Sequence, residues 1–299
     1  MDKDLLNDDK WLFEQYQKHG ATTIARKVGT YEKAVRQRLQ ALGVKIRSAS
    51  ESIKLSTSGK SYSTLNIDFF KNIDTEEKAY WLGFLMADGC VREYRSGCYQ
   101  TSLELSTIDK ELVYNFRDAI KCDGPIYSDD IRTRFVVTNT QFARNLISHN
   151  VVPHKTFNKV FPNLNKKLYR AYILGYFDAD GSITLYQSKD KTHIERARFH
   201  IACGSYSFLE KIKEILEEEA GLCFNTKSLN TMHCNSKMTE LYTAKMPNIA
   251  KIYDYFYTDV TIPFMQRKKD KFDTIISYYI TRPLLIKRYS PNCLEINRT

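Results

Sequence analysis

A thirteen-residue segment occurs twice in the chain, and this repeat constrains the fold more than any other feature. Residues 79–91 (AYWLGFLMADGCV) align without a gap on residues 171–183 (AYILGYFDADGSI). Each copy is an apolar run with helical spacing. Each run ends in an aspartate, Asp88 or Asp180, which a glycine follows. Two such helices in one chain predict two similar halves and a pseudo-twofold site where the helices end.

The repeat also predicts that its two helices pack against each other. Small residues lie four apart on one face of each copy: Gly83 with Ala87, and Gly175 with Ala179. Small side chains at this spacing let two helix backbones approach closely. Gly89 and Gly181 stand where each helix would end, and glycine tolerates the left-handed conformation that often closes a helix.

The two aspartates favour a divalent cation. Asp88 and Asp180 fall in the last helical turn, where the helix dipole is negative and a carboxylate by itself is unfavourable. A metal ion would reverse the sign of that interaction, and Mg²⁺ prefers carboxylate, water and phosphate oxygens. Solvated helix ends are the alternative for a single Asp-Gly pair. Repetition of the whole segment favours the metal site.

These segments resemble the LAGLIDADG motif of homing endonucleases, with copies at residues 81–89 and 173–181. Residues 150–156, followed by Phe161-Pro162, resemble the link between the halves of single-chain members. Residues 262–272 resemble its counterpart in the second half. The resemblance implies an α+β fold in which two αββαββα halves form a DNA-binding saddle. It also implies metal-dependent cleavage of both DNA strands.

Carried over by position, Asp88 and Asp180 would be the metal-binding, catalytic acids of that family. Lys155 and Lys268 resemble the basic residues beside the scissile phosphates, although Lys269 competes with Lys268 for the second position. Met86 stands where the second copy has Asp178. The resemblance does not make that position a metal ligand, so we interpret Asp178 as a capping or packing residue.

Residues 10–47 have a separate helical pattern. Three helices are expected, and Ala25, Gly29 and Val35 have the offsets of a helix-turn-helix. A helical hairpin without DNA contact is the alternative. The pattern resembles the helix-turn-helix appendages of phage and bacterial homing enzymes. Polar side chains on the outer face of the last helix and just beyond it suit phosphates and base edges: Lys33, Arg36, Gln37, Gln40, Lys45 and Arg47.

Strand alternation in each half predicts a polar sheet face opposite a packed one. Ile131, Phe135 and Val137 are expected on the packed face of the first half, and Ala197, Phe199 and Ile201 on that of the second. The polar faces, which would contact DNA or simply be solvated, carry Arg132, Arg134, Arg196, Arg198 and His200. The expected domains are a helix-turn-helix domain (1–47), a Ser/Thr-rich linker (48–66), two halves (67–157 and 158–280) and a basic tail (281–299).

Composition agrees with a nucleic-acid partner. The net charge is +10 and the pI about 9.1, which suits a polyanion. Seven cysteines without a C-x-x-C pair argue against a disulfide framework and a zinc site. Because no signal peptide or long apolar stretch is found, we expect no membrane partner. We also expect a monomer. It would act in the cytoplasm of a bacterial or phage-infected cell, or in an organelle, and would not be secreted.

The sequence therefore predicts a site-specific double-strand DNA endonuclease that hydrolyses phosphodiester bonds with Mg²⁺. Two other functions stay open. A DNA-binding regulator on the same scaffold would not cut, although the presence of both acids favours cutting. An intron maturase would bind intron RNA, although a helix-turn-helix favours duplex DNA.

Overall fold

The computed structural model describes residues 3–48, 51, 64–189, 193–224, 229–231 and 238–281. Contacts divide the chain into two units, Met1–Ser63 and Thr64–Thr299. The boundary falls inside the stretch expected as a linker, most of which (52–63) lies outside the described residues. All but the first residue of the expected basic tail also lies outside them.

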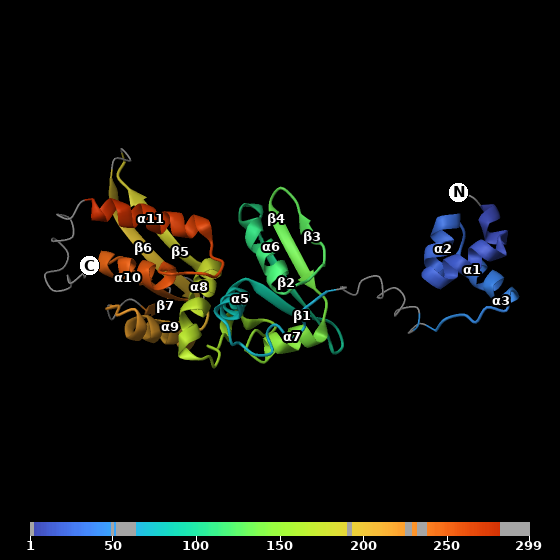
Figure 1. Cartoon of the computed structure of the whole chain (residues 1–299), viewed down its shortest axis with the longest axis horizontal. Helices are drawn as coiled ribbons and strands as arrows, with labels where there is room; N and C mark the ends of the chain where they lie inside the picture. Colours follow the sequence, from blue (N-terminus) through green and yellow to red (C-terminus); the bar gives the residue numbers. More distant parts are fainter. Residues whose placement is uncertain are drawn as a thin grey trace. The chain divides into compact units, whose positions relative to one another are not determined.

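Residues 3–48 of the first unit form the three α-helices that the sequence predicts. A 3-10 helix, η1 (Lys3–Asn7), precedes α1 (Asp9–Lys18), α2 (Ala21–Val28) and α3 (Glu32–Ala41) (Figure 1). Leu12, Ile24, Val35 and Leu39 form its buried core. Gly29 ends α2 with a φ of 73°, a left-handed conformation that glycine adopts without steric cost. The chain can therefore turn sharply from α2 into α3.

The second unit consists of two halves with the same order of elements. The first half contains α5 (Glu76–Ala87), β1 (Gly89–Arg95), β2 (Cys98–Ser106), α6 (Lys110–Ala119), β3 (Ile126–Ser128), β4 (Arg132–Val137) and α7 (Thr140–Ile147). The second contains α8 (Tyr169–Asp180), β5 (Gly181–Gln187), β6 (Ile194–Cys203), α9 (Tyr206–Glu219), β7 (Leu229–Thr231), β8 (Thr239–Thr243) and α10 (Met246–Tyr257). A further helix, α11 (Gln266–Ile280), follows.

Each half is an αββαββα unit with an antiparallel sheet, so the predicted α+β fold is confirmed. The strand orders, β1-β2-β4-β3 and β5-β6-β8-β7, are equivalent. The register is equivalent too, because Gly89 pairs with Leu103 and Gly181 with Ile201. Three short 3-10 helices connect elements: η2 (Thr107–Asp109), η3 (Lys155–Phe157) and η4 (Lys166–Leu168). Both η3 and η4 belong to the link between the halves.

Helices α5 and α8 pack against each other at the boundary between the halves (Figure 1). Residues 79–86 of α5 and 171–178 of α8 are all buried, as expected for helices that are apolar on every side. Gly83 of α5 faces the backbone of α8, and Gly175 of α8 faces the backbone of α5. A Cβ at Gly83 would lie 2.0 Å from the Tyr172 carbonyl oxygen, and one at Gly175 would lie 2.0 Å from that of Tyr80. The predicted close packing is confirmed.

We expected Gly89 and Gly181 to adopt the left-handed conformation that closes a helix, and this expectation is wrong. Gly181 is extended, with φ −85° and ψ 166°, and neither residue is among the described glycines with positive φ. Each starts a strand directly after its helix. A Cβ at Gly89 would meet the Leu85 carbonyl oxygen at 2.6 Å, and one at Gly181 would meet that of Phe177 at 2.6 Å. Glycine is therefore required by close approach, not by a left-handed turn.

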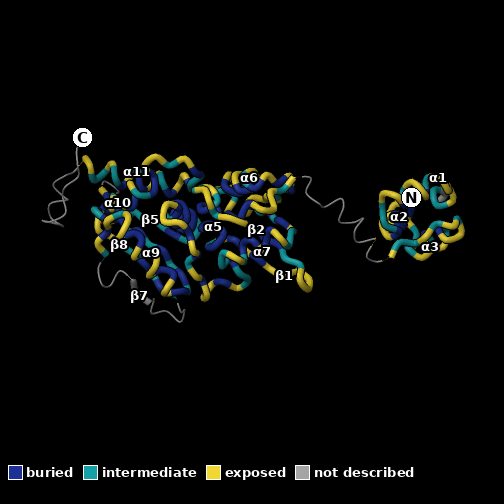
Figure 2. Tube along the Cα trace, turned by 60° about the horizontal axis from the view of Figure 1, so that its bottom comes forward, coloured by how far each residue is buried: buried dark blue, intermediate teal, exposed yellow. Residues whose placement is uncertain are grey.

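Alternation in the sheets follows the prediction with one exception. Phe135, Val137, Phe199 and Ile201 are buried in the interiors of the two halves, which are dark blue in Figure 2. Ile131 was expected on the packed face but is 72% exposed. It precedes β4, so the two-residue periodicity of the strand does not apply to it.

The described chain gives no sign of a membrane span or a disulfide. None of its helices combines the length and the hydrophobicity that crossing a bilayer requires. The cysteines that the structure describes are free thiols.

Replacing either interface glycine should destabilise the second unit strongly. In Gly83→Ala and Gly175→Ala the new methyl group would overlap a backbone carbonyl that cannot rotate away, so the helices must separate. We expect a loss of about 3 kcal/mol or more in the free energy of unfolding. Urea unfolding followed by Trp81 fluorescence in a Trp11→Phe background measures it.

Gly20→Ala is the control. A Cβ there meets nothing within 4 Å, and the residue belongs to the first unit, so the urea midpoint of the second unit should not move. An unchanged midpoint in Gly83→Ala would contradict the close contact.

Candidate active site

The two repeated aspartates lie together where α5 and α8 end. Asp88 is the C-terminal cap of α5, and Asp180 is the last residue of α8. Their carboxylates interact electrostatically. Protein around Asp88 raises its pKa to about 6 by removing solvent, and the charge of Asp180 adds to this rise. The structure thus brings together the two acids that the sequence singled out.

A hollow of about 370 Å³ opens beside Asp88. Both halves of the second unit line it, with Asp88, Glu104 and Arg132 from the first and Ala179 and Arg267 from the second. Charged groups of both signs therefore border one open space next to an acid. Such a space suits a highly charged ligand better than an apolar one.

Lys155 and Lys268 occupy equivalent positions in the two halves. The Lys155 ammonium donates to the Gly89 carbonyl oxygen, directly after Asp88. The Lys268 ammonium donates to the carbonyl oxygens of Gly181, Phe177 and Asp178 at 2.6–2.7 Å. Cations are favourable at helix C-termini, where carbonyl groups lack partners. Lys268 therefore caps carbonyl groups in the last turn of α8, whereas Lys155 contacts the carbonyl group of the first residue of β1, just beyond α5.

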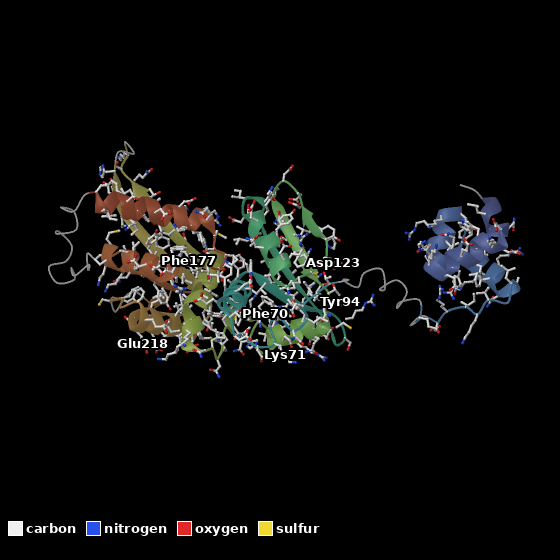
Figure 3. All side chains as sticks on the ribbon, in the orientation of Figure 1. Phe70, Lys71, Tyr94, Asp123, Phe177 and Glu218 are labelled. Carbon is white, nitrogen blue, oxygen red and sulfur yellow. The ribbon has the colours of Figure 1, made fainter. Side chains whose placement is uncertain are left out.

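Burial changes the titration of both lysines. Loss of solvent lowers the pKa of Lys155 to about 8 and that of Lys268 to about 8, while the nearby acids oppose the change. The Lys268 ammonium also lies 5.0 Å from the centre of the Phe177 ring, which Figure 3 labels in the second half. The carboxylates and helix ends thus keep two cations in a site with little water.

Lys269 lies in different surroundings from Lys268. Its ammonium donates to Asp273, four residues later on α11, at 2.9 Å. This is an ordinary helix-surface ion pair. Lys268, not Lys269, contacts the end of α8.

Sequence reasoning missed Lys159, which contacts an acid directly. Its ammonium donates to Asp180 Oδ2 at 2.8 Å and to the Tyr176 hydroxyl at 2.7 Å. Its side chain is 7% exposed. The available signal was its place in the link between the halves, four residues after Lys155. A lysine in a stretch without clear periodicity does not otherwise reveal its partner.

Asp178 links the two halves at the start of α11. Its Oδ2 accepts from the Tyr80 hydroxyl of α5 at 3.0 Å and from the Met265 backbone N–H at 2.8 Å. Met265 is the N-cap residue of α11 and precedes Lys268 by three residues. The interpretation of Asp178 as a capping or packing residue agrees with this place. Burial raises its pKa to about 6, which the neighbouring Lys268 opposes.

An ion pair between Arg267 and Asp109 also joins the two halves, and both residues line the hollow beside Asp88. Arg267 of α11 donates to both oxygens of Asp109 in η2, at 2.8 and 2.9 Å. The paired geometry fixes the guanidinium orientation as well as its position. Arg267 and Asp109 were not predicted, because 158 residues separate them in the sequence.

The polar residues predicted on the sheets lie on the unpacked faces, and several pair with acids. Arg132 donates to Glu104 at 2.8 Å, and Arg134 lies 3.7 Å from the same carboxylate. Arg198 donates to both oxygens of Glu240 at 2.8 Å. Arg196 instead stacks on the Tyr186 ring. His200 is half-buried, and loss of solvent lowers its pKa.

Most of the residues predicted to contact DNA in the first unit are open to solvent. Exposed side chains on and after α3 are those of Lys33, Arg36, Gln37, Gln40 and Lys45. Arg36 donates to Glu32 one turn earlier at 2.6 Å.

Arg47 instead packs within the unit. Its guanidinium lies 4.2 Å from the Tyr16 ring centre and donates to the His19 carbonyl oxygen. Its backbone N–H donates to the Tyr16 hydroxyl.

The acid pair fits a divalent cation. The charge of Asp180 makes Asp88 harder to ionise. A positive ion between the two carboxylates would relieve this repulsion, and carboxylates are hard oxygen ligands. Within the described residues, no three His, Cys, Asp or Glu side chains form a possible metal site. Among the described side chains, Asp88 and Asp180 are the two carboxylates that would hold the ion. Mg²⁺ commonly takes such a set, with water and phosphate oxygens completing its shell.

Comparison with known proteins supports the fold. Residues 167–227 match the LAGLIDADG-like domain family. The chain is also similar to the crystal structure of the LAGLIDADG homing endonuclease I-GzeII in complex with its DNA target. Sequence identity is 12%, the TM-score is 0.50, and the match covers 74% of this chain and 99% of the other. The chain is also similar to the crystal structure of the I-LtrWI LAGLIDADG homing endonuclease bound to target DNA. There the sequence identity is 15% and the TM-score 0.46, and the match covers 78% of this chain and 100% of the other.

No curated protein matches the chain in sequence. The match over residues 167–227 and the similarity to I-GzeII show that the chain has the fold of LAGLIDADG homing endonucleases, with an additional helical unit at its N-terminus.

Asp88→Asn should stabilise the metal-free protein. The pKa of Asp88 is about 6 in the folded chain, against 3.8 ordinarily, so the ionised carboxylate costs stability above about pH 6 and not below 3.8. An uncharged amide removes that cost. Because Asp88 reaches solvent, we expect a gain of about 1 kcal/mol or less at pH 7.5, and a smaller one at pH 5. Thermal unfolding in EDTA at both pH values measures it.

Asp180→Asn is the matched comparison and should act in the opposite direction. It leaves the Lys159 ammonium buried without a carboxylate, which should cost about 1–2 kcal/mol at pH 7.5. Equal effects of the two substitutions would contradict the structural difference between the acids.

Proposed function

We propose that the chain is a site-specific DNA endonuclease that hydrolyses one phosphodiester bond in each strand with Mg²⁺ or a similar cation. The observation that carries the proposal is the pair of acids at adjoining helix ends, each beside a buried lysine. One acid and one such lysine per half match the two phosphates that a double-strand cut requires. Similarity to I-GzeII, whose structure contains a DNA target, supports the choice of substrate.

The residues would act in three ways. Asp88 and Asp180 would hold the cations, and a bound cation would lower the pKa of water and stabilise the leaving oxygen. Lys155 and Lys268 keep positive charge beside the acids and would offset the charge that develops on each phosphate. Asp178 and Arg267 fix the start of α11, and through it the position of Lys268. A site that is rigid before DNA binds needs little reorganisation during the reaction.

DNA would lie across the sheets and be held by the polar faces. Arg132, Arg134, Arg196, Arg198 and His200 are the candidate contacts of the second unit. Those of the first unit are Lys33, Arg36, Gln37, Gln40 and Lys45, which suit a helix in the major groove. Arg47 would contribute less to DNA contact, because Tyr16 and backbone carbonyls already hold it. Since one chain supplies both acids, a monomer would suffice.

Selection from a randomised duplex library tests the function. Full-length protein would recover bound duplexes in EDTA, and Mg²⁺ would then be added to the enriched pool. The proposal predicts a single recovered sequence that is cut in both strands. Binding without cutting would support the regulator instead, and preferential binding of structured intron RNA over the duplex would support the maturase.

Loss of either acid should abolish cutting but not DNA binding. We expect Asp88→Asn and Asp180→Asn to lower the cleavage rate of the selected duplex by about 1,000-fold or more, since each removes the carboxylate that holds a cation. Affinity for the duplex in EDTA should stay within about three-fold, because most protein–DNA affinity comes from phosphate contacts elsewhere. Gel shifts and labelled-strand cleavage measure the two effects. Cleavage at the original rate in the double variant would refute the roles of both acids.

Lys268 and Lys269 form a matched pair for the role of the buried lysines. Lys268→Met removes the ammonium beside the acids, and we expect cleavage to slow about 100-fold or more, as when a donor to a developing anion is lost. Lys269→Met removes the pair with Asp273 and the contacts with the Tyr253 and Tyr257 rings, none of which involves the acids, so its rate should stay within about three-fold. Both rates are measured below the melting temperature of the weaker variant. Equal losses, or a larger loss in Lys269→Met, would argue against Lys268.

A further inference from the structure

The two acids differ in their partners although their helices repeat. Asp180 accepts an ion pair from Lys159 at 2.8 Å. Within the described residues, no hydrogen bond or ion pair reaches the Asp88 carboxylate. The charge of Lys159 does reach Asp88, but more weakly than that of Lys268. One acid of the pair is therefore neutralised directly and the other is not.

The sequence explains why the ion pair occurs once. Lys159 also donates to the Tyr176 hydroxyl, and the residue aligned with Tyr176 in the first copy is Phe84, which has no hydroxyl. Lys159 itself lies in the link between the halves. The corresponding stretch after Lys268 continues as α11, whose Phe272 packs its ring 5.9 Å from that of Phe177. The chain joins the halves only once, so this lysine has no second copy.

A lysine held against a ligand oxygen opposes a cation at that oxygen. Lys159 is almost fully buried, so it cannot move into water without losing two partners. A divalent ion that binds Asp180 must share the carboxylate with this ammonium and approach a fixed positive charge. At Asp88 the same ion meets a carboxylate that no ammonium contacts.

We propose that Lys159 makes the two acids unequal ligands, so that Asp180 contributes less than Asp88 to divalent-cation binding. If the chain is the nuclease proposed above, the strand cut at Asp180 is then cut second. Lys159 acts through Asp180 and is a positioning residue. Its effect is separable from folding, because it concerns the difference between two acids in one protein.

Mn²⁺ binding to the full chain without DNA tests the first statement. Free Mn²⁺ is followed by electron paramagnetic resonance in the original protein, in Asp88→Asn and in Asp180→Asn. Asp88→Asn should weaken binding about three- to ten-fold more than Asp180→Asn, which is the range expected for one partly screened charge. In a Lys159→Met background the two substitutions should agree within about two-fold.

Three results would overturn the proposal. They are equal losses from the two acid substitutions in the original protein, a difference that persists in Lys159→Met, and no measurable Mn²⁺ binding at millimolar concentrations. Lys159→Gln, which can still hydrogen-bond Asp180 and Tyr176, replaces Lys159→Met if the latter does not fold. Tyr176→Phe is the control that keeps the ion pair and should keep the difference between the acids.

Strand order tests the second statement and separates it from the proposed function. On a selected duplex with a different label on each strand, the original protein should accumulate a product nicked in one strand. Lys159→Met should reduce that accumulation about three-fold or more by speeding the slower cut. No cleavage by the original protein would reject the proposed function alone. Equal cutting rates in the original protein, or slower cutting of both strands in Lys159→Met, would reject the inference.

Discussion

The contact between the backbones of α5 and α8 is the constraint on which the second unit depends. Gly83 and Gly175 each face a carbonyl oxygen of the other helix at a distance that leaves no room for a side chain. This contact holds the two helix ends, and so the two acids, close together. The sheets, the capping lysines and the hollow beside Asp88 are arranged around that fixed pair.

The adjoining C-termini of α5 and α8 place negative groups close together, and buried lysines offset this repulsion. Two C-termini bring together carbonyl groups without helical partners and two carboxylates, all of which are negative. Lys268 donates to carbonyl oxygens at the end of α8, and Lys155 donates to the Gly89 carbonyl oxygen just beyond α5. Lys159 donates to the Asp180 carboxylate. Asp88 has no direct cation partner among the described residues, and loss of solvent together with the charge of Asp180 raises its pKa. A site that holds such a charge is suited to a ligand that brings positive charge with it.

Duplication of a half does not give two equivalent sites when a single chain carries both. The repeated helices are equivalent in length, burial and glycine contacts. The segments that close them differ, since an irregular link follows the first half and a regular helix follows the second. Lys159 belongs to the link and Arg267 to α11, and Asp178 of α8 contacts the start of α11. The repeated halves are thus alike in their helices and sheets, whereas the segments that follow them and the charged contacts around the acids differ.

Sequence alone determined the features that depend on local pattern. The repeat at residues 79–91 and 171–183 predicted two similar halves, their helix contact and the two acids, because helical spacing and glycine placement are readable along the chain. Strand alternation similarly placed Arg134 and Arg198 on the unpacked faces.

Only the tertiary structure decided which distant groups meet. Lys159 with Asp180, Arg267 with Asp109 and Tyr80 with Asp178 join residues between 21 and 158 positions apart. No periodicity encodes such pairs. The need for Gly89 and Gly181 also became clear only in three dimensions, since it comes from the turn of each helix into its strand. Local pattern fixes which face a side chain occupies, whereas burial and packing fix the partner of each charge.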